Sequence, residues 1–376
     1  MTDSVSGLEL RSLVTAGGEL RLSLEDVTLD PAGADEVIVR VEAAPINPSD
    51  LGLLLGPADV ATLVASGTAE RPVVTMQVPP ERLGGVKARL DQSMPVGNEG
   101  AGTVIAAGEG AGDLVGKRVG MLGGAMYTQF RKLKTRDVVA LPEGASASDG
   151  ASMFVNPLTA LGFVETAKAE GHKAIIHTAA ASNLGQMLQR ICLADGVPLV
   201  NIVRSAAQAK ILSDIGATYV LDSGDADFRS KLTDSIAETK ATIAFDAIGG
   251  GKLGSDIVQA MEAAAVRDMA EYSRYGSDRF KQLYIYGALD LGPTVLNRLA
   301  FGFSWSVSGW LLTPFLAKAG RDVAARLRRR VVDELTTTFA SHYTATIGLA
   351  EALSPEVLRA YNRKATGEKY LIDPTR

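Results

Sequence analysis

The sequence is poor in the side chains that most often bind transition metals. Its 376 residues include one cysteine, Cys192, and three histidines, His172, His177 and His342. One cysteine cannot form an intrachain disulfide, which fits a reducing compartment, and we expect the cytoplasm. One cysteine and three scattered histidines also argue against a cysteine-rich zinc site. We therefore predict that the protein holds no metal.

The chain also lacks an excess of positive charge and a long uninterrupted apolar segment. It has 38 Lys and Arg against 43 Asp and Glu, a net charge of −5, which gives no indication of nucleic-acid binding. The arginines of 326–330 fall in a helical pattern and are interpreted as a solvated helix face. The apolar run 301–316 is broken by Ser, Gly, Thr and Pro, and residues 1–12 have no apolar core. The sequence thus predicts neither a membrane span nor a signal peptide.

Residues 173–204 read as a strand, a tight turn, a helix and a second strand, although the usual glycine pattern of such a turn is incomplete. The three glycine-type positions hold Ala179, Ser182 and Gly185. Small side chains still let backbone N–H groups approach a pyrophosphate at a helix N-terminus, and Ser182 and Asn183 are good capping residues. The pattern predicts the first half of a dinucleotide-binding βαβ unit. A helix cap that binds nothing remains the alternative reading of the turn.

The end of the second strand indicates which dinucleotide is bound. An Asp or Glu there would accept a hydrogen bond from the free ribose hydroxyl of NAD. This strand ends instead in Arg204-Ser205, a cation and a hydroxyl suited to a 2′-phosphate. The sequence therefore predicts NADPH as the cofactor.

The chain changes its pattern near residue 156. Residues 1–155 contain short alternating strands between Gly- and Pro-containing turns, which favours a mainly β domain. The stretch 59–94 mixes helical and loop character, and we expect a lid or an elaborated loop there. From residue 156 helices and strands alternate, as in a doubly wound parallel sheet covered on both faces. The predicted fold class is α/β.

The order and spacing of several short segments resemble the medium-chain dehydrogenase/reductase superfamily, and within it the zinc-free quinone oxidoreductase and 2-enoyl thioester reductase branch. The resemblance covers roughly residues 8–373. It implies a GroES-like catalytic domain (1–155, with a C-terminal return over 311–376), a Rossmann domain (156–310), and an active site in the cleft between them. The segments are AAPINPSD (43–50), VGNEGAGTVIAAG (96–108), NPLTA (156–160), ASNLGQ (181–186), NIVRS (201–205), SDIGATYVLDS (213–223), FDAIGG (245–250) and YIYGAL (284–289).

The resemblance also implies zinc-free chemistry. Asn47, Asn98 and Asn156 stand where zinc-dependent relatives have metal ligands. Neutral amides are poor zinc ligands. We interpret Glu99 as an acceptor for turn N–H groups or a partner of an arginine, and Asp50 as an Asx-turn residue.

The resemblance assigns the cofactor-binding residues position by position. Asn156 and Thr159 contact the nicotinamide side. The pyrophosphate is assigned to the helix turn and the 2′-phosphate to the end of the second strand, whereas the remaining residues line or close the nicotinamide pocket. The full set is Asn156, Thr159, Ser182, Asn183, Leu184, Gly185, Arg204, Ser205, Tyr286, Gly287, Ala288, Leu289, Trp310, Leu311 and Lys369.

The catalytic acid is the main departure from the resemblance. The enoyl reductases carry an acid Tyr about ten residues after the NPSD motif, and the matching position here is Ala58. The catalytic residues are thus unidentified, with Asn47 and Tyr127 as weak candidates. Tyr272 and Tyr275 lie in an insertion at 266–282 and are further sources of a proton or surface residues.

These observations predict a zinc-independent, NADPH-dependent oxidoreductase that transfers hydride to a quinone or an activated alkene. Two alternatives remain open: a 2-enoyl thioester reductase of acyl-chain metabolism, and an NADPH-binding sensor or scaffold without catalysis. We expect a small-molecule substrate, with neither nucleic acid nor membrane as partner. The resemblance implies a homodimer joined through the apolar stretch 300–310. The alternative is that this stretch is buried in the core of the monomer.

Overall fold

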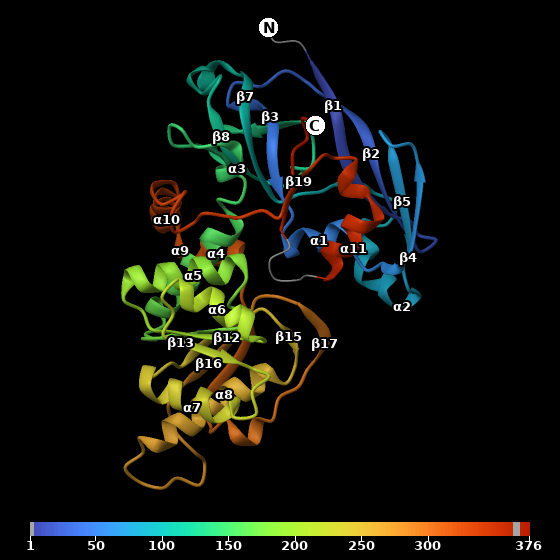
Figure 1. Cartoon of the computed structure of the whole chain (residues 1–376). Helices are drawn as coiled ribbons and strands as arrows, with labels where there is room; N and C mark the ends of the chain where they lie inside the picture. Colours follow the sequence, from blue (N-terminus) through green and yellow to red (C-terminus); the bar gives the residue numbers. More distant parts are fainter. Residues whose placement is uncertain (1–3, 364–368) are drawn as a thin grey trace. The chain divides into compact units, whose positions relative to one another are not determined.

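The computed structural model describes residues 4–363 and 369–376. The chain divides into two compact units, Met1–Val155 with Val332–Arg376, and Asn156–Val331. Figure 1 shows the chain coloured from the N-terminus to the C-terminus. The predicted domains, 1–155 with a return over 311–376 and 156–310, stay a prediction beside this division into compact units.

The second unit is built on a six-stranded parallel sheet. Its strands follow the order β13-β12-β11-β14-β16-β18, and each neighbouring pair is parallel. The order reverses between β11 and β14, which is a topological switch point, the place where open α/β sheets bind ligands. The strands are β11 (Ile175–His177), β12 (Leu199–Val203), β13 (Tyr219–Asp222), β14 (Ile243–Asp246), β16 (Lys281–Ile285) and β18 (Trp305–Gly309); β15 (Gly249–Gly251) and β17 (Asp290–Thr294) form a separate parallel pair.

Helices connect the strands and cover both faces of this sheet. Helices α5 and α6 lie on one face, and α7 and α8 lie on the other (Figure 1). Apolar side chains of α7 and α8 pack with β12, β14 and β16 in one buried cluster. The α-helices of this part are α4 (Val155–Ala169), α5 (Asn183–Asp195), α6 (Ala206–Asp214), α7 (Phe228–Thr239), α8 (Leu253–Arg267), α9 (Leu312–Ala319) and α10 (Arg321–Asp333); η5 (Arg298–Ala300) is a short 3-10 helix.

Ion pairs connect α10 to two other helices of the second unit. Arg326 binds the Glu165 carboxylate on α4 at 2.7 Å, and Arg330 binds Asp195 at the end of α5 at 2.9 Å. The side chain of Arg326 is exposed, whereas that of Arg330 is only partly exposed. Both arginines are thus paired with acids, and the Arg326 side chain is also solvated, as the sequence predicts for this helix. Among the described residues, no helix combines the length and apolarity that a bilayer span requires.

The first unit consists mainly of antiparallel sheet. One sheet has the order β4-β5-β2-β1-β6, and the other has β10-β8-β7-β3-β20-β19, with β9 paired to β3. The strands are β1 (Val5–Val14), β2 (Glu19–Leu29), β3 (Glu36–Pro45), β4 (Asp59–Gly67), β5 (Pro72–Gln77), β6 (Ser93–Pro95), β7 (Glu99–Ala107), β8 (Arg118–Leu122), β9 (Phe130–Lys134), β10 (Val138–Ala140), β19 (Ala345–Ile347) and β20 (Tyr370–Ile372). The helical segments are η1 (Pro48–Asp50), α1 (Leu51–Leu54), α2 (Pro80–Leu83), η2 (Gly84–Arg89), η3 (Glu109–Leu114), η4 (Thr135–Asp137), α3 (Ala147–Gly150), η6 (Glu351–Leu353) and α11 (Pro355–Arg363).

The stretch 59–94 differs from the expected lid or loop in its first half. Strands β4 and β5 form an antiparallel hairpin that extends the first sheet beyond β2. Successive residues of PVVTMQ alternate in burial, as in a strand on a sheet: Val74 and Met76 are buried, whereas Val73 and Thr75 are partly exposed. Only the part from α2 to η2 keeps the helical and loop character that the sequence indicated.

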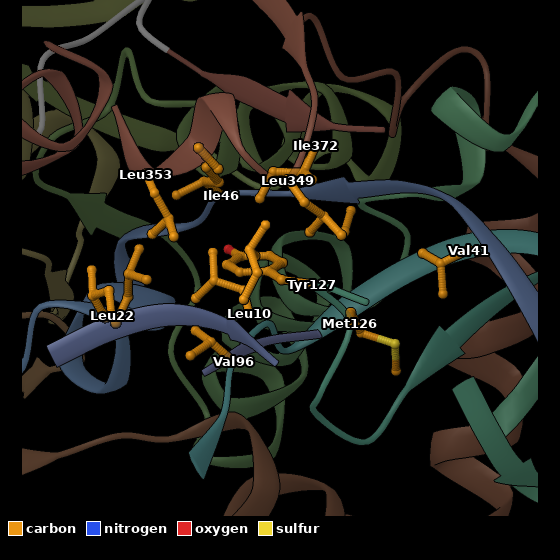
Figure 2. Close-up of a cluster of buried hydrophobic side chains, with 14 of the residues drawn as sticks. Leu10, Leu22, Val41, Ile46, Val96, Met126, Tyr127, Leu349, Leu353 and Ile372 are labelled. Atoms are coloured by element: carbon orange, nitrogen blue, oxygen red, sulfur yellow. The ribbon is translucent and has the colours of Figure 1, made fainter. Parts of the chain in front are cut away.

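The core of the first unit joins segments from both ends of the chain. Leu10 and Leu22 from the N-terminal strands lie with Leu349, Leu353 and Ile372 from the C-terminal return in one buried cluster (Figure 2). This packing explains why residues after 331 belong to the same unit as the first 155. Burial of a Leu or Ile side chain stabilises a fold by about 1.5–3 kcal/mol.

Candidate functional site

The turn after β11 is compact and leaves no room for a side chain at its third small position. Ser182 caps α5, and its Oγ accepts the backbone N–H of Gly185 at 3.2 Å. A Cβ atom on Gly185 would lie 2.1 Å from the carbonyl oxygen of Ala180. Ala179 has a positive φ of 50°, an uncommon conformation that turns the chain into the helix. Small side chains therefore leave the backbone N–H groups in the first turn of α5 accessible. Such groups at a helix N-terminus can bind a phosphate.

The next strand end carries the cation that the sequence indicated. β12 ends at Val203, and Arg204 follows with an exposed side chain. Ser205 caps α6, and its Oγ accepts the N–H of Gln208 at 3.3 Å. The Ser205 hydroxyl can still donate a hydrogen bond, and the Arg204 guanidinium has no ion-pair partner in the part of the chain that the structure describes. A phosphate oxygen at this edge would meet donors from both residues.

A buried Thr–Asp pair ties β11 to β14 at the switch point, and the sequence reading had assigned it no role. Thr178 Oγ1 donates to Asp246 Oδ1 at 2.6 Å. Asp246 also accepts the backbone N–H groups of Ile248 at 3.0 Å and Gly249 at 3.1 Å. The carboxylate thus fixes the glycine-containing turn after β14 next to the turn after β11. The FDAIGG segment was the available signal, because an Asp directly before a Gly-rich turn commonly accepts turn N–H groups.

A histidine and a tyrosine lie together inside the second unit. The Nε2 atom of His177 is 2.8 Å from the Tyr286 hydroxyl, and the two rings are stacked with centroids 5.8 Å apart. Phe163 packs against Tyr286 with centroids 4.7 Å apart. His177 is fully buried, and burial lowers its pKa to about 3. Burial also raises the pKa of Tyr286, so both groups are neutral near pH 7.

Replacing His177 with Gln is expected to remove part of the acid sensitivity of the second unit. The folded state keeps His177 neutral down to about pH 3, whereas the unfolded chain binds a proton below about pH 6.5. The wild type should therefore lose about 1.4 kcal/mol per pH unit relative to the Gln variant as pH falls from 6.5 towards 4. Urea unfolding of both proteins at pH 7 and pH 5, followed by tryptophan fluorescence, measures this difference. Equal pH slopes would contradict it.

The predicted nicotinamide-pocket residues have contrasting environments. Trp310 is buried, with its Nε1 donating to Thr166 Oγ1 at 3.1 Å and its ring stacked on Phe315. Leu311, the next residue, is 66% exposed. The Trp310 side chain thus belongs to the interior of the second unit, and the prediction that it lines the pocket stays untested. The predicted residues placed in this unit are Asn156, Thr159, Ser182, Asn183, Leu184, Gly185, Arg204, Ser205, Tyr286, Gly287, Ala288, Leu289, Trp310 and Leu311, whereas Lys369 belongs to the first unit.

The first unit contains a buried polar network around two carboxylates. Glu99 Oε1 accepts the Asn47 side-chain amide at 2.8 Å, and its Oε2 accepts the N–H groups of Phe154 and Val155 at 2.8 and 2.9 Å. Glu99 is fully buried, and burial raises its pKa against the effect of these donors. The interpretation of Glu99 as an acceptor for turn N–H groups is therefore confirmed.

Asp50 occupies the same network and has the role of a turn acceptor. Its Oδ2 accepts the N–H of Asn47 at 2.8 Å, and its Oδ1 accepts the N–H of Asn98 at 2.9 Å. Burial raises the pKa of Asp50 to about 7, although these N–H groups oppose the shift and nearby Glu99 adds to it. Asn98 also donates from its side chain to Ser49 Oγ at 3.1 Å. Within the described residues, no group of His, Cys, Asp and Glu side chains has a metal-binding arrangement.

The candidate acids differ sharply in their surroundings. Tyr127 is fully buried among core side chains, and its hydroxyl donates to the Pro45 carbonyl at 3.1 Å (Figure 2). Ala58, at the position of the family tyrosine, is buried and has no acidic group. Tyr272 and Tyr275 are 92% and 62% exposed in the insertion. A sealed phenol that already donates to a carbonyl is a poor proton source, so this geometry disfavours Tyr127 as the acid.

Two residues that contact the predicted site residue Lys369, directly or through one hydroxyl, were not found from the sequence: Ser152 and Tyr343. The Nζ atom of Lys369 donates to Ser152 Oγ at 2.8 Å, and Ser152 is hydrogen-bonded to the Tyr343 hydroxyl at 2.8 Å. Neither Ser152 nor Tyr343 lies in a recognisable motif. Their pairing depends on contact between segments about 190 residues apart in the chain, which local patterns do not report.

The chain resembles known proteins along its whole length in structure and along about half of its length in sequence. No family model matches it. It is 26% identical over 211 residues to the mitochondrial enoyl-[acyl-carrier-protein] reductase of Bos taurus, covering 53% of this chain and 48% of that protein. The match thus spans about half the length of this curated relative.

Solved structures match the entire fold. A Mesorhizobium loti protein named as a NADPH:quinone reductase superposes with a TM-score of 0.71 at 25% identity, covering 100% of this chain and 99% of that one. Escherichia coli quinone oxidoreductase, solved in complex with NADPH, superposes with a TM-score of 0.70 at 18% identity, covering 98% and 100%. The second likeness concerns the fold alone. The chain is thus similar in sequence to an enoyl reductase and in fold to quinone oxidoreductases, proteins of the medium-chain dehydrogenase/reductase superfamily that its sequence motifs also resemble.

Proposed function

We propose that the protein is a zinc-independent, NADPH-dependent oxidoreductase that reduces a quinone or an activated alkene. The proposal rests on one observation: two groups of hydrogen-bond donors follow the neighbouring strands β11 and β12. The tight turn before α5 suits a pyrophosphate, and Arg204 with Ser205 suits a 2′-phosphate. The Escherichia coli neighbour was solved with NADPH, which supports the same cofactor for this chain.

The cofactor is assigned to groups whose geometry fits it. Backbone N–H groups of residues 182–185 would hold the pyrophosphate, because the missing Cβ at Gly185 keeps the turn closed against α5. Arg204 and Ser205 would hold the 2′-phosphate. Asn156, Thr159 and the segment 286–289 are proposed for the nicotinamide side. When bound, NADPH supplies hydride; the protein positions it and excludes water.

Replacing Arg204 with Ala should weaken NADPH binding by roughly ten- to a hundredfold and leave NADH binding nearly unchanged. The guanidinium would donate a charge-assisted hydrogen bond to the 2′-phosphate, worth about 1.5–3 kcal/mol, and NADH lacks that phosphate. Fluorescence titration with both dinucleotides measures the two dissociation constants. Lys210→Ala is a matched control, because Lys210 lies on α6 and pairs with Asp214. A wild type that prefers NADH would refute the assignment.

The absence of an acidic side chain at position 58 favours a quinone as the substrate. A quinone takes up hydride at an electron-poor site and depends less on a positioned acid than an enoyl thioester does, and Ala58 provides none. A 2-enoyl thioester reductase remains a second candidate, supported by the similarity to the bovine enoyl reductase. NADPH oxidation measured with simple quinones, enones and crotonyl thioesters distinguishes these candidates. NADPH binding without turnover of any acceptor would favour the sensor or scaffold alternative.

We also propose a homodimer joined through β18. This strand lies at the edge of the parallel sheet, where its outer backbone groups can pair with another strand. Apolar side chains near it are exposed, including Leu299 at 86% and Phe303 at 60%. Ser306→Asp should place like charges opposite each other and convert the dimer to monomers, as measured by light scattering at micromolar concentration. A monomeric wild type would rule out the dimer, and a dimeric Asp variant would place the interface elsewhere.

A further inference from the structure

Asp246, the last residue of β14, is hydrogen-bonded to three separate segments of the second unit. Its Oδ1 accepts the hydroxyl of Thr178, which directly follows β11, at 2.6 Å. Its Oδ1 and Oδ2 accept the N–H groups of Ile248 and Gly249 at 3.0 and 3.1 Å. Its backbone carbonyl accepts the N–H of Tyr286, which directly follows β16, at 2.9 Å. One residue thus connects the segments that come after β11, β14 and β16.

The same three segments also contact one another through their backbones. The N–H of Ala247 donates to Thr178 Oγ1 at 2.8 Å, and its carbonyl accepts the N–H of Leu289 at 3.1 Å. A Cβ atom on Gly287 would lie 2.5 Å from the Ala247 carbonyl oxygen. Gly249 has a left-handed φ of 79°, and a Cβ atom there would lie 2.9 Å from the Gly287 carbonyl oxygen. The segments are therefore packed backbone against backbone.

The chemistry of these contacts requires a carboxylate at position 246. Asp246 is 2% exposed, and among the described residues no cation forms an ion pair with it, so hydrogen bonds replace the water around its oxygens. Asparagine has the same shape, but its NH2 group would face a donor. An apolar side chain would leave the donors unsatisfied. Because a buried carboxylate is costly and core packing does not need one, its presence points to a requirement on the arrangement of these segments.

Two of the connected segments contain the residues assigned to the cofactor. The turn after β11 includes 182–185, assigned to the pyrophosphate, and 286–289 are assigned to the nicotinamide side. The strand order reverses between β11 and β14, so Asp246 lies at the switch point of the sheet. A dinucleotide that binds both segments needs them at a fixed separation, because ordering them during binding would reduce the affinity.

We propose that Asp246 is a positioning residue for NADPH binding, which holds the segments after β11, β14 and β16 in the arrangement that receives the cofactor. Thr178 shares this role, because its hydroxyl connects the end of β11 to the Asp246 carboxylate. The inference rests on the proposed function, in which these segments bind the pyrophosphate and the nicotinamide side. Both side chains act through the backbone that they hold, whereas the 2′-phosphate is assigned to Arg204 and Ser205 after β12.

The first test is the affinity of Asp246→Asn for three ligands. NADPH and NADH binding should weaken by the same factor, roughly ten- to 100-fold, because both contain the pyrophosphate and the nicotinamide. Adenosine 2′-monophosphate has neither group and should bind within about twofold of its wild-type affinity. Calorimetric titration measures all three. This pattern differs from that of Arg204→Ala, which should affect NADPH alone. Asp268→Asn is the matched control, because its carboxylate pairs with Lys240 and Arg279 outside these segments.

A series at Thr178 separates the hydroxyl from the packing of the side chain. Thr178→Val has nearly the same shape, but it leaves Asp246 without one donor and the Ala247 N–H without its acceptor. It should weaken NADPH and NADH by roughly tenfold. Thr178→Ser keeps the hydroxyl and should retain affinity within about twofold of the wild type. The series decides the question if Asp246→Asn does not fold.

Hydrogen exchange of the cofactor-free protein measures the arrangement of the segments directly. In Asp246→Asn the amides of 247–251 and 286–289 should exchange roughly tenfold faster than in the wild type, because the bonds that hold them are weakened. The amides of 257–264, in the middle of α8, should keep their wild-type protection. Mass spectrometry of peptides after timed labelling gives both rates.

The outcomes separate the proposal from its premise. Wild-type affinity for NADPH in both Asp246→Asn and Thr178→Val would overturn the positioning role. Equal losses of NADPH and adenosine 2′-monophosphate would also overturn it, because they would indicate a general loss of structure. Unchanged exchange of the two segments in Asp246→Asn would do the same. Failure of the wild type to bind NADPH would instead remove the proposed function, and this inference with it.

Discussion

Replacing Lys281 with Met is expected to lower the free energy of unfolding of the second unit by about 3–5 kcal/mol, because it leaves a buried carboxylate unpaired. Lys281 is fully buried, and its Nζ lies 2.7 Å from Glu262 Oε2. Glu262 also accepts the N–H and the hydroxyl of Ser277, both at 2.6 Å. Burial raises the pKa of Glu262, but Lys281 and Ser277 outweigh this effect and hold the pKa below its usual value.

Urea unfolding followed by tryptophan fluorescence measures the loss, since both tryptophans, Trp305 and Trp310, lie in the second unit. Removing the ammonium takes away the largest effect that lowers the pKa of Glu262, so we expect burial to raise this pKa in the folded variant. The deficit should therefore be largest near neutral pH and shrink as pH falls towards 4–5, where the variant protonates Glu262. Lys231→Met is the matched control, because Lys231 forms only exposed ion pairs and should cost less than about 1 kcal/mol. A similarly small loss for Lys281→Met would show that the buried pair contributes little.

Adding one methyl group at Gly185 is expected to disrupt the turn before α5 and with it dinucleotide binding. The Cβ of Gly185→Ala would lie 2.1 Å from the Ala180 carbonyl oxygen and 2.6 Å from its carbon, which are backbone atoms that cannot rotate away. Overpacking of this kind costs about 1–3 kcal/mol of stability. The displaced N–H groups should weaken NADPH affinity by roughly 100-fold, or about 2.7 kcal/mol.

Thermal unfolding and NADPH titration of the Gly185→Ala protein give the two quantities separately. Gly112→Ala is a suitable control, because apart from its chain neighbours and the backbone of its own 3-10 helix no heavy atom lies within 4 Å of the added Cβ. The control should keep both stability and affinity close to those of the wild type. Unchanged NADPH affinity in Gly185→Ala would mean that the pyrophosphate does not bind at this turn, even if stability falls as expected.

The parallel half of the fold was predictable because its signals are local. Each strand of the second unit is a short apolar run between a helix and a turn, and helices such as α5 begin at a capping serine and end near a glycine with left-handed φ, Gly196 at 65°. The hairpin of β4 and β5 was not predicted. Its sequence alternates too weakly, and its strand character depends on pairing with β2.

The candidate site also has a part that local sequence predicted and a part that only the structure shows. The turn at 179–185 and the strand end at 204–205 were read from adjacent residues, because a phosphate site at a helix N-terminus needs only a few consecutive positions. The Thr178–Asp246 pair and the Lys369–Ser152–Tyr343 series join residues 68, 217 and 191 positions apart. Sequence spacing carries no signal for such contacts.

The sequence by itself determined the fold class, the superfamily resemblance and the absence of a tyrosine at position 58, and it supplied the prediction of a 2′-phosphate site at Arg204 and Ser205. These properties depend on composition, periodicity and residues that are neighbours in the chain. Only the tertiary structure decided that Tyr127 is sealed in the core, that Lys281 is paired with Glu262, and that Lys369 donates to Ser152. Burial and hydrogen bonding set the protonation of such groups, and both arise when distant segments pack together.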